Sequence, residues 1–288
     1  MSNRVESIFI IQPQFLFGRP DSNFTVVPSG TSVSSPSLDT KTGELSGGET
    51  LSIYRSAPIE WSAKVADIHI SLFDGTLRVS SEHEDYREAL TVNESMATQL
   101  CLLLSQQNEF SVFCEFKYGF NELTQSKLQL PHVIHLANMA AYNLKGLQNQ
   151  LDICVARMGT MEAKAEKSLA YLGHAYRLHK LIQNSDRGDL LGRYLLNTDI
   201  VLHCYKSISC IIGDPSIDSD YQSRYRSIGI TRETWTESED IRRTIRNKLD
   251  VAHYRIDWNA SSEISAAMPR AMKLAKSVLD QYFTHLLS

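Results

Sequence analysis

The spacing of apolar residues changes once along this chain, and that change constrains the fold more than any single motif does. In the first ~120 residues, short β-branched and aromatic segments alternate with period two, as in half-buried strands. From about Ser126 onward the apolar residues recur at helical spacing over long segments. The sequence therefore predicts an α+β protein, with a small β-rich domain at residues 1–125 and an antiparallel helical bundle at residues 126–288.

The N-terminal part contains several short alternating segments, which we predict to be strands at 7–11, 50–54, 67–73, 76–80 and 110–116. Asp74 and Gly75 separate two of these segments and are a strong signal for a two-residue hairpin. One amphipathic helix is expected at about 94–106. Residues 28–48 are rich in Ser, Thr, Gly and Pro, a composition that predicts a long mobile loop.

The C-terminal part contains long segments of helical period, which predict helices at about 132–158, 161–183, 188–212, 238–255 and 263–287. The third of these ends at Gly213, which precedes Asp and Pro and is a good stop signal. The fourth begins with Thr236 and Glu239 at the spacing of a capping box. Pro269 marks either the true start of the last helix or a kink in it.

The composition and charge of the chain limit its partners and its compartment. A net charge of −4 gives no global attraction for nucleic acid, so any contact with RNA needs a local basic patch. The polar N-terminus and the lack of an apolar run of ~20 residues predict neither a signal peptide nor a membrane span, so a cytoplasmic location is expected. The spacing of the cysteines does not match a disulfide framework, so we expect buried free thiols in a reducing compartment. The cysteines are Cys101, Cys114, Cys154, Cys204 and Cys210.

The predicted helix at 238–255 carries an arginine and a histidine, Arg246 and His253, seven residues apart. Seven residues are about two helical turns, so both side chains leave one face, at the edge of the apolar stripe. A fixed cation beside a group that titrates near neutral pH suits cleavage of a phosphodiester. His253 could act as a general base or acid, Arg246 could hold the scissile phosphate, and Asn247 could orient either of them.

Spacing alone does not establish a site. Arg78 and His83 have a similar spacing in a strand and loop region, where no helix aligns them. The alternative for the motif is a surface pair between Arg246 and Asp250, with His253 capping a neighbouring carbonyl.

Aromatic and cationic residues also gather before the motif helix, in an expected loop. They could stack on bases and bind phosphate, and with Arg242 they form the predicted RNA-binding set of Arg242, Tyr221, Arg224, Tyr225 and Arg226.

Other histidines are weaker candidates. His132 and His135 have a spacing that could serve a metal, but no Cys, Asp or Glu completes a set, so a role at a helix N-terminus is favoured. His174 and His179 share a helix with Tyr171 and could line an RNA path, although partly exposed packing is the better interpretation. No metal site and no cofactor are expected.

The segment around Arg246, Asn247 and His253 resembles the motif of the HEPN superfamily, the higher eukaryote and prokaryote nucleotide-binding domains. These are bundles of four or five helices that carry an Arg-polar-x(3–5)-His motif in a late helix. Residues 166–176 resemble an early HEPN helix, and residues 195–208 resemble the helix that packs against the motif in the anti-phage type. The resemblance covers about residues 160–288.

The resemblance implies a metal-independent RNA endonuclease that acts as a homodimer, in bacterial defence or growth arrest. It implies that Arg246 and His253 of both subunits meet in a cleft and promote attack of the RNA 2′-hydroxyl on the adjacent phosphate, with Asn247 auxiliary. An antitoxin or a phage-derived trigger would control it, and the β-rich domain would be a sensor. HEPN toxins controlled by nucleotidyltransferase antitoxins carry a tyrosine two places after the histidine. Here Tyr254 follows His253 directly, which disfavours that form of control.

Two other functions are compatible with the sequence. One is a non-catalytic HEPN-like dimeric scaffold or nucleotide-binding module, in which the Arg–His pair is structural. The other is a ligand sensor that uses the β-rich domain, with the helices serving only dimerisation.

Overall fold

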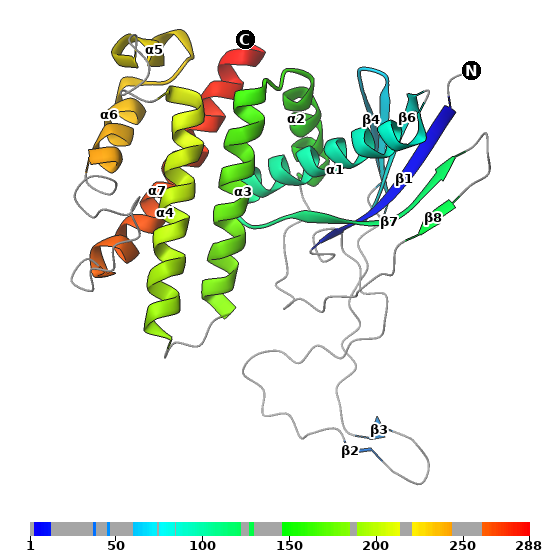
Figure 1. The fold of residues 1–288 in the computed structure, drawn as a ribbon, viewed down its shortest axis with the longest axis horizontal. Coiled ribbons are helices and arrows are strands. Elements are labelled where there is room, and N and C mark those ends of the chain that lie inside the picture. Colours follow the sequence, from blue (N-terminus) through cyan, green and yellow to red (C-terminus); the bar gives the residue numbers. More distant parts are fainter. Residues whose placement is uncertain are drawn as a thin grey trace.

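An antiparallel sheet forms the N-terminal part of the protein, and most of the helices follow it in the chain (Figure 1). The mixed α+β class predicted from the sequence is confirmed. The computed structural model describes residues 3–12, 37–38, 45–46, 60–73, 75–83, 85–121, 127–129, 146–184, 189–213, 221–243 and 261–288.

The main sheet has six antiparallel strands in the order β4-β5-β6-β1-β7-β8. They are β1 (Asn3–Gln12), β4 (Glu60–Val65), β5 (Ile68–Phe73), β6 (Thr76–His83), β7 (Phe113–Asn121) and β8 (Lys127–Gln129). Two further short strands, β2 (Ser37–Leu38) and β3 (Leu45–Ser46), pair with each other in a separate sheet.

Four of the expected strands are confirmed, as β1, β5, β6 and β7. The expected strand at 50–54 and most of the expected loop at 28–48 lie outside the described residues. The hairpin between β5 and β6 is also confirmed, because Phe73 pairs with Thr76 across a two-residue turn. Gly75 has a φ of 76°, a left-handed conformation that glycine adopts without steric cost.

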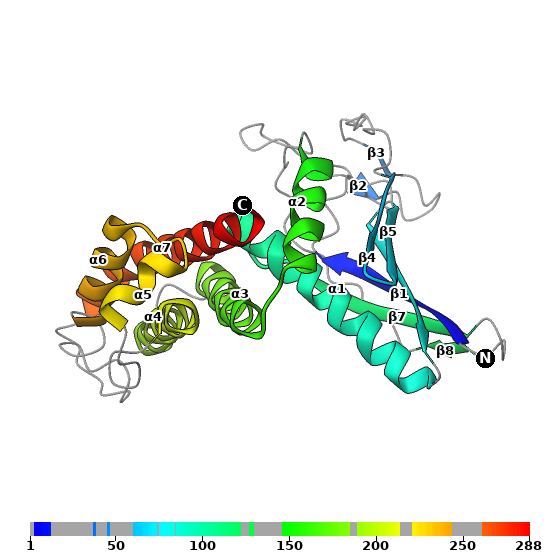
Figure 2. The same cartoon turned by 90° about the horizontal axis from the view of Figure 1, so that it is seen from above.

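The first helix, α1 (Tyr86–Asn108), is longer than the 94–106 expected, because Asp85 caps it by accepting a hydrogen bond from the Arg87 amide at 2.7 Å. It packs on one face of the sheet, where the buried Asn93 amide donates to the carbonyl of Val5 at 3.1 Å and to Ser7 Oγ at 2.9 Å. Figure 2 shows that it also extends toward the C-terminal helices. One core of buried residues therefore runs from the sheet to the last helix and crosses the expected domain boundary at 125/126.

The remaining helices are α2 (Leu147–Gly159), α3 (Ala163–Asn184), α4 (Leu190–Ile212), α5 (Tyr221–Ser227), α6 (Arg232–Ile241) and α7 (Ser261–Leu287). Helices α3, α4 and α7 confirm the expected segments 161–183, 188–212 and 263–287, and Gly213 is the C-cap of α4 as predicted. Helix α2 begins only at Leu147, and residues 132–145 of the expected first helix, with His132 and His135, lie outside the described part.

Two details of the helical prediction are wrong. The fourth expected helix begins at Arg232 and not near 238, because Thr231 is its N-cap and Thr236 lies inside it. Of the two alternatives for Pro269, the structure shows the second, because this proline lies inside α7 and not at its start. The segment expected as a loop before the motif contains the short helix α5.

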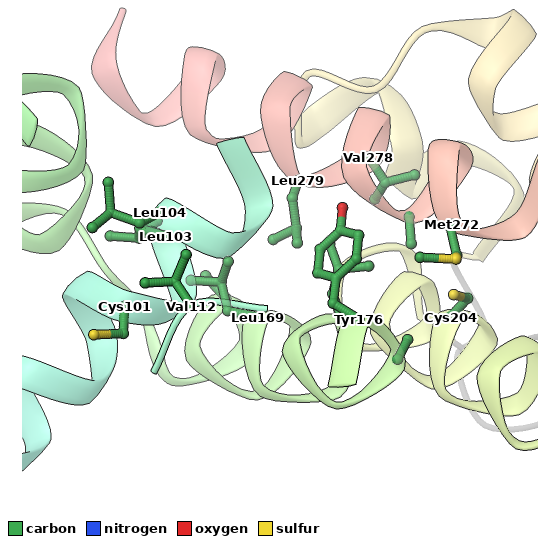
Figure 3. Close-up of a cluster of buried hydrophobic side chains, with 14 of the residues drawn as sticks. Cys101, Leu103, Leu104, Val112, Leu169, Tyr176, Cys204, Met272, Val278 and Leu279 are labelled. Atoms are coloured by element: carbon green, nitrogen blue, oxygen red, sulfur yellow. The ribbon is translucent and has the colours of Figure 1, made fainter. Parts of the chain in front are cut away.

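Helices α3 and α4 lie side by side and run in opposite directions, and α7 crosses one side of the pair (Figures 1 and 2). Figure 3 shows Tyr176 of α3, Cys204 of α4, and Met272 and Val278 of α7 in one buried cluster. All the cysteines are free thiols. The expected burial is confirmed for Cys101, Cys154 and Cys204, whereas Cys114 and Cys210 are only partly buried. In the part of the chain that the structure describes, no helix has the length and hydropathy to cross a membrane.

A buried ion pair joins three of these helices. Arg157 of α2, 8% exposed, donates to Gln106 of α1 at 2.7 Å and to Asp280 of α7 at 3.0 Å. Its guanidinium also lies 5.0 Å from the ring centroid of Phe283. Burial raises the pKa of the Asp280 carboxyl, but hydrogen bonds from Lys276 and Gln106 and the charge of Arg157 outweigh it, so that pKa lies below its usual value.

Replacing Arg157 with methionine should lower the free energy of unfolding by about 2 kcal/mol, because Gln106 and Asp280 lose their hydrogen bonds to a buried guanidinium, while Asp280 keeps its ion pair with Lys276. Urea denaturation followed by circular dichroism measures this loss. Arg270→Met is the matched control: Arg270 also pairs with two carboxylates but is half exposed, so we expect a change within about 1 kcal/mol. Equal losses in the two variants would contradict a structural role for the buried pair.

Candidate functional site

The proposed catalytic residues Arg246, Asn247 and His253 lie outside the described residues. The described segments on either side of them are α6, which ends at Ile241 with one irregular turn to Arg243, and α7, which begins at Ser261.

The start of α6 is fixed by Thr231. Its hydroxyl oxygen accepts a hydrogen bond from the Thr234 amide at 3.3 Å, and its own amide donates to Gln281 Oε1 of α7 at 2.8 Å. Thr236, which the sequence predicted as the cap, instead donates its hydroxyl proton to the Arg232 carbonyl at 2.8 Å. The motif segment is therefore preceded by a helix anchored at its N-terminus to α7.

Arg242, predicted to bind RNA, forms a two-pronged ion pair with Glu239. Its Nε lies 3.0 Å from Oε1, and its Nη2 lies 2.8 Å from Oε2. The side chain of Glu239 is only 10% exposed, which strengthens the pair. An RNA phosphate would have to compete with this carboxylate for the guanidinium.

The aromatic and cationic residues of α5 are divided between packing and surface. Tyr225 is buried and stacks on Trp235 of α6, with ring centroids 5.2 Å apart, and the exposed Arg226 lies over its ring at 5.6 Å. Stacking of a base on Tyr225 would require this pair to separate. Arg224 is half-buried, and of Tyr221 only the backbone, at the start of α5, is described.

Charged residues of α6 and α7 surround an open pocket, in which the cation from α7 is paired with two carboxylates from α6. Arg270 of α7 lies 2.9 Å from Glu237 and 2.8 Å from Asp240. These ion pairs hold α6 against α7. The pocket is lined by Arg232, Glu233, Thr236, Glu237, Asp240 and Arg270.

A second group of polar and aromatic side chains lies where α3 meets α4. The rings of His174 on α3 and His203 on α4 have centroids 4.3 Å apart, and Tyr171 lies 5.8 Å from His203. The ammonium of Lys206 lies 5.7 Å from the centroid of the Tyr171 ring. One turn further along, the buried hydroxyl of Ser168 bonds the Ser207 carbonyl at 2.8 Å. The antiparallel register of the helices thus brings these residues together.

The sequence singled out His174 and Tyr171 but missed His203 and Lys206. The sequence does contain a signal for this group. Tyr171 and His174 are about one turn apart on one helix, and His203 and Lys206 are about one turn apart on the next. If the two helices pack antiparallel, Tyr171 lies opposite Lys206 and His174 lies opposite His203. Of the other residues singled out, His179 is part-buried, and burial lowers its pKa.

Burial lowers the pKa of His203 to about 4, with the charges of His174 and Lys206 adding to the effect and that of Asp199 opposing it. Its Nδ1 is buried and has no hydrogen-bond partner. A neutral imidazole with its proton on Nε2 avoids burying an unpaired N–H donor, so this form is favoured at neutral pH.

Among the residues with described positions, no group of three or more His, Cys, Asp or Glu side chains could hold a metal ion. No protein-family model, no curated protein and no solved structure matches the chain.

The cap of α6 can be tested with two threonines. Thr231→Ala should lower the free energy of unfolding by about 1 kcal/mol, because the amide of Thr234 loses its acceptor. Thr236→Ala, in the exposed interior of the same helix, should change it by less than about 0.5 kcal/mol. Thermal or urea denaturation measures the free energy of unfolding of both variants. A larger loss of this free energy for Thr236→Ala than for Thr231→Ala would contradict the start of α6 at Arg232.

The lowered pKa of His203 predicts a pH dependence of stability. The folded state binds a proton at this residue only near pH 4, whereas the unfolded chain binds it near pH 6.5, so its stabilising contribution is present above pH 6.5 and lost between 6.5 and 4. His203→Gln should therefore lose less unfolding free energy than the parent between pH 7 and pH 4.5 in urea denaturation. Equal losses would show that this pKa is not lowered by folding.

Proposed function

We propose that the protein is an RNA endonuclease of HEPN type that works without a metal ion, with Arg246 and His253 as its catalytic residues. The observation that carries the proposal is the sequence Arg246-Asn247-x5-His253, placed late in a run of helices. The α+β architecture supports it, because the motif follows α3, α4 and α6 and precedes α7, all of which pack in one helical group. The HEPN-type arrangement of this group is part of the proposal.

In the proposed reaction, His253 takes the proton from the RNA 2′-hydroxyl. The 2′-oxygen then attacks the adjacent phosphorus, while Arg246 binds the non-bridging oxygens and stabilises their growing negative charge. The bond to the 5′-oxygen breaks, and that oxygen receives a proton from a general acid, which we assign to His253 of the partner subunit. The products are a 2′,3′-cyclic phosphate and a free 5′-hydroxyl. The step consumes no water, and it does not require a metal ion.

A homodimer is part of the proposal, because one His253 cannot be base and acid at once. Asn247 would orient the substrate or one of the catalytic groups. The enzyme would act in the cytoplasm in bacterial defence or growth arrest, with residues 1–125 as a sensor of a phage-derived trigger or a contact for an antitoxin. These biological roles rest on the family resemblance alone.

Cleavage of labelled RNA by the purified protein in excess EDTA tests this function. Arg246→Ala and His253→Ala should each reduce the cleavage rate by about 100-fold or more, because each removes a group acting in the transition state. The same substitutions should relieve any growth arrest on expression in bacteria.

Arg78→Ala is the matched control, because Arg78 and His83 have a similar spacing in the sheet and no proposed catalytic role. It should cleave RNA like the parent. The catalytic proposal fails if Arg246→Ala and His253→Ala also cleave like the parent, or if the parent cleaves no RNA. An intact dimer without cleavage would instead favour the scaffold or nucleotide-binding module.

A further inference from the structure

Positive charge gathers on two neighbouring helices of a protein that is negative overall. The net charge of the chain is −4. Helices α3 and α4, by contrast, carry only two carboxylates, Glu166 and Asp199. Their cations are Lys164, Lys167, Arg177, Lys180, Arg193 and Lys206, of which Lys164 is paired with Glu162 just before α3. This pair of helices is therefore a local basic region of the kind that contact with RNA requires.

Four side chains meet on the side of this pair that faces away from α7. We call them the α3/α4 seam: Tyr171 and His174 from α3, and His203 and Lys206 from α4. The opposite side of the two helices is buried against α7 (Figures 2 and 3). His174 is exposed and the other three are partly exposed, so a ligand can reach the seam from solvent.

The polar side chains of the seam can donate hydrogen bonds to a ligand. Lys206 is held over the ring of Tyr171, and His203 lies between Tyr171 and His174. In the described part of the chain, no ion pair links Lys206 to a carboxylate, and no hydrogen bond occupies the imidazoles of His174 and His203. This distinguishes the seam from Arg242 and Arg270, whose charges are neutralised by Glu239, Glu237 and Asp240.

The convergence of these groups favours an anion. An ammonium and two imidazoles within reach of one another repel when charged, and an anion between them would relieve that repulsion. Even with His203 neutral, its Nε2–H can donate a hydrogen bond. A metal ion fits less well than a phosphate, because no carboxylate or thiol among the described residues joins the two imidazoles as a third metal ligand.

We propose that the α3/α4 seam binds a phosphate group of single-stranded RNA, with Lys206, His174 and His203 as its contacts and Tyr171 positioning Lys206. Phosphate contacts provide most of the affinity of proteins for nucleic acids, and they need no particular base sequence. The choice of RNA rests on the proposed function; a free nucleotide is the other source of the same phosphate chemistry.

Fluorescence anisotropy of a fluorescein-labelled oligouridylate tests this site, in a His253→Ala background that prevents cleavage. Lys206→Gln should weaken binding about tenfold and reduce the slope of log affinity against log salt by about 1. The double variant His174→Gln/His203→Gln should also weaken binding. Lys64→Gln, on the exposed side of the sheet strand β4, is the matched control and should bind like the background protein. Circular dichroism checks that each variant is folded.

Competition identifies the source of the phosphate. Unlabelled RNA should displace the probe at far lower concentration than uridine monophosphate or inorganic phosphate. Displacement by the monophosphate at equal concentration assigns the seam to a free nucleotide and overturns the RNA assignment. If both seam variants bind like Lys64→Gln, or the background protein does not bind RNA, the seam proposal is wrong. Cleavage of RNA by the parent, measured separately, decides the catalytic proposal in either case.

Discussion

The buried ion pair between Arg157 and Asp280 connects the helices on which the rest of the structure depends. Arg157 lies on α2, Asp280 lies on α7, and Gln106 of α1 bonds to both. The buried guanidinium of Arg157 would be costly without these partners, which favours the arrangement of the three helices that brings the side chains together. Helix α7 also packs along α4 and α3 through apolar residues, and it covers one side of that pair.

Helix α1 also connects distant parts of the structure, because the sheet packs against one side of it and the C-terminal helices pack against the other. Its Asn93 reaches the backbone of β1, while Cys101 and Leu103 belong to the same core as residues of α3 and α7. The Nε1–H of Trp61 on β4 adds a second link by donating to Asp152 of α2 at 2.8 Å. The sheet and the helical group therefore share buried surface through α1.

Much of the fold could be predicted from the sequence, because strong periodicity and turn residues act locally. The hairpin at Gly75, the end of α4 at Gly213 and the extents of α3 and α7 all follow from such signals. The errors come from interactions between distant residues. Thr231 caps α6 partly because Gln281 of α7 binds its amide, and Tyr225 is buried because Trp235 lies against it. Likewise, the meeting of His203 with His174 depends on the register of two helices. The one-turn spacings in the sequence are compatible with that register but do not determine it.

In the proposed function, the Arg246/His253 motif would cut the RNA, and Lys206 with the two imidazoles would bind its backbone. The central claim is the chemistry of the cut, and the ends of the RNA products test it most directly. Mass spectrometry of RNA cleaved by the parent in EDTA should show 2′,3′-cyclic phosphates and 5′-hydroxyls. Products with 3′-hydroxyls and 5′-phosphates would contradict attack by the 2′-hydroxyl.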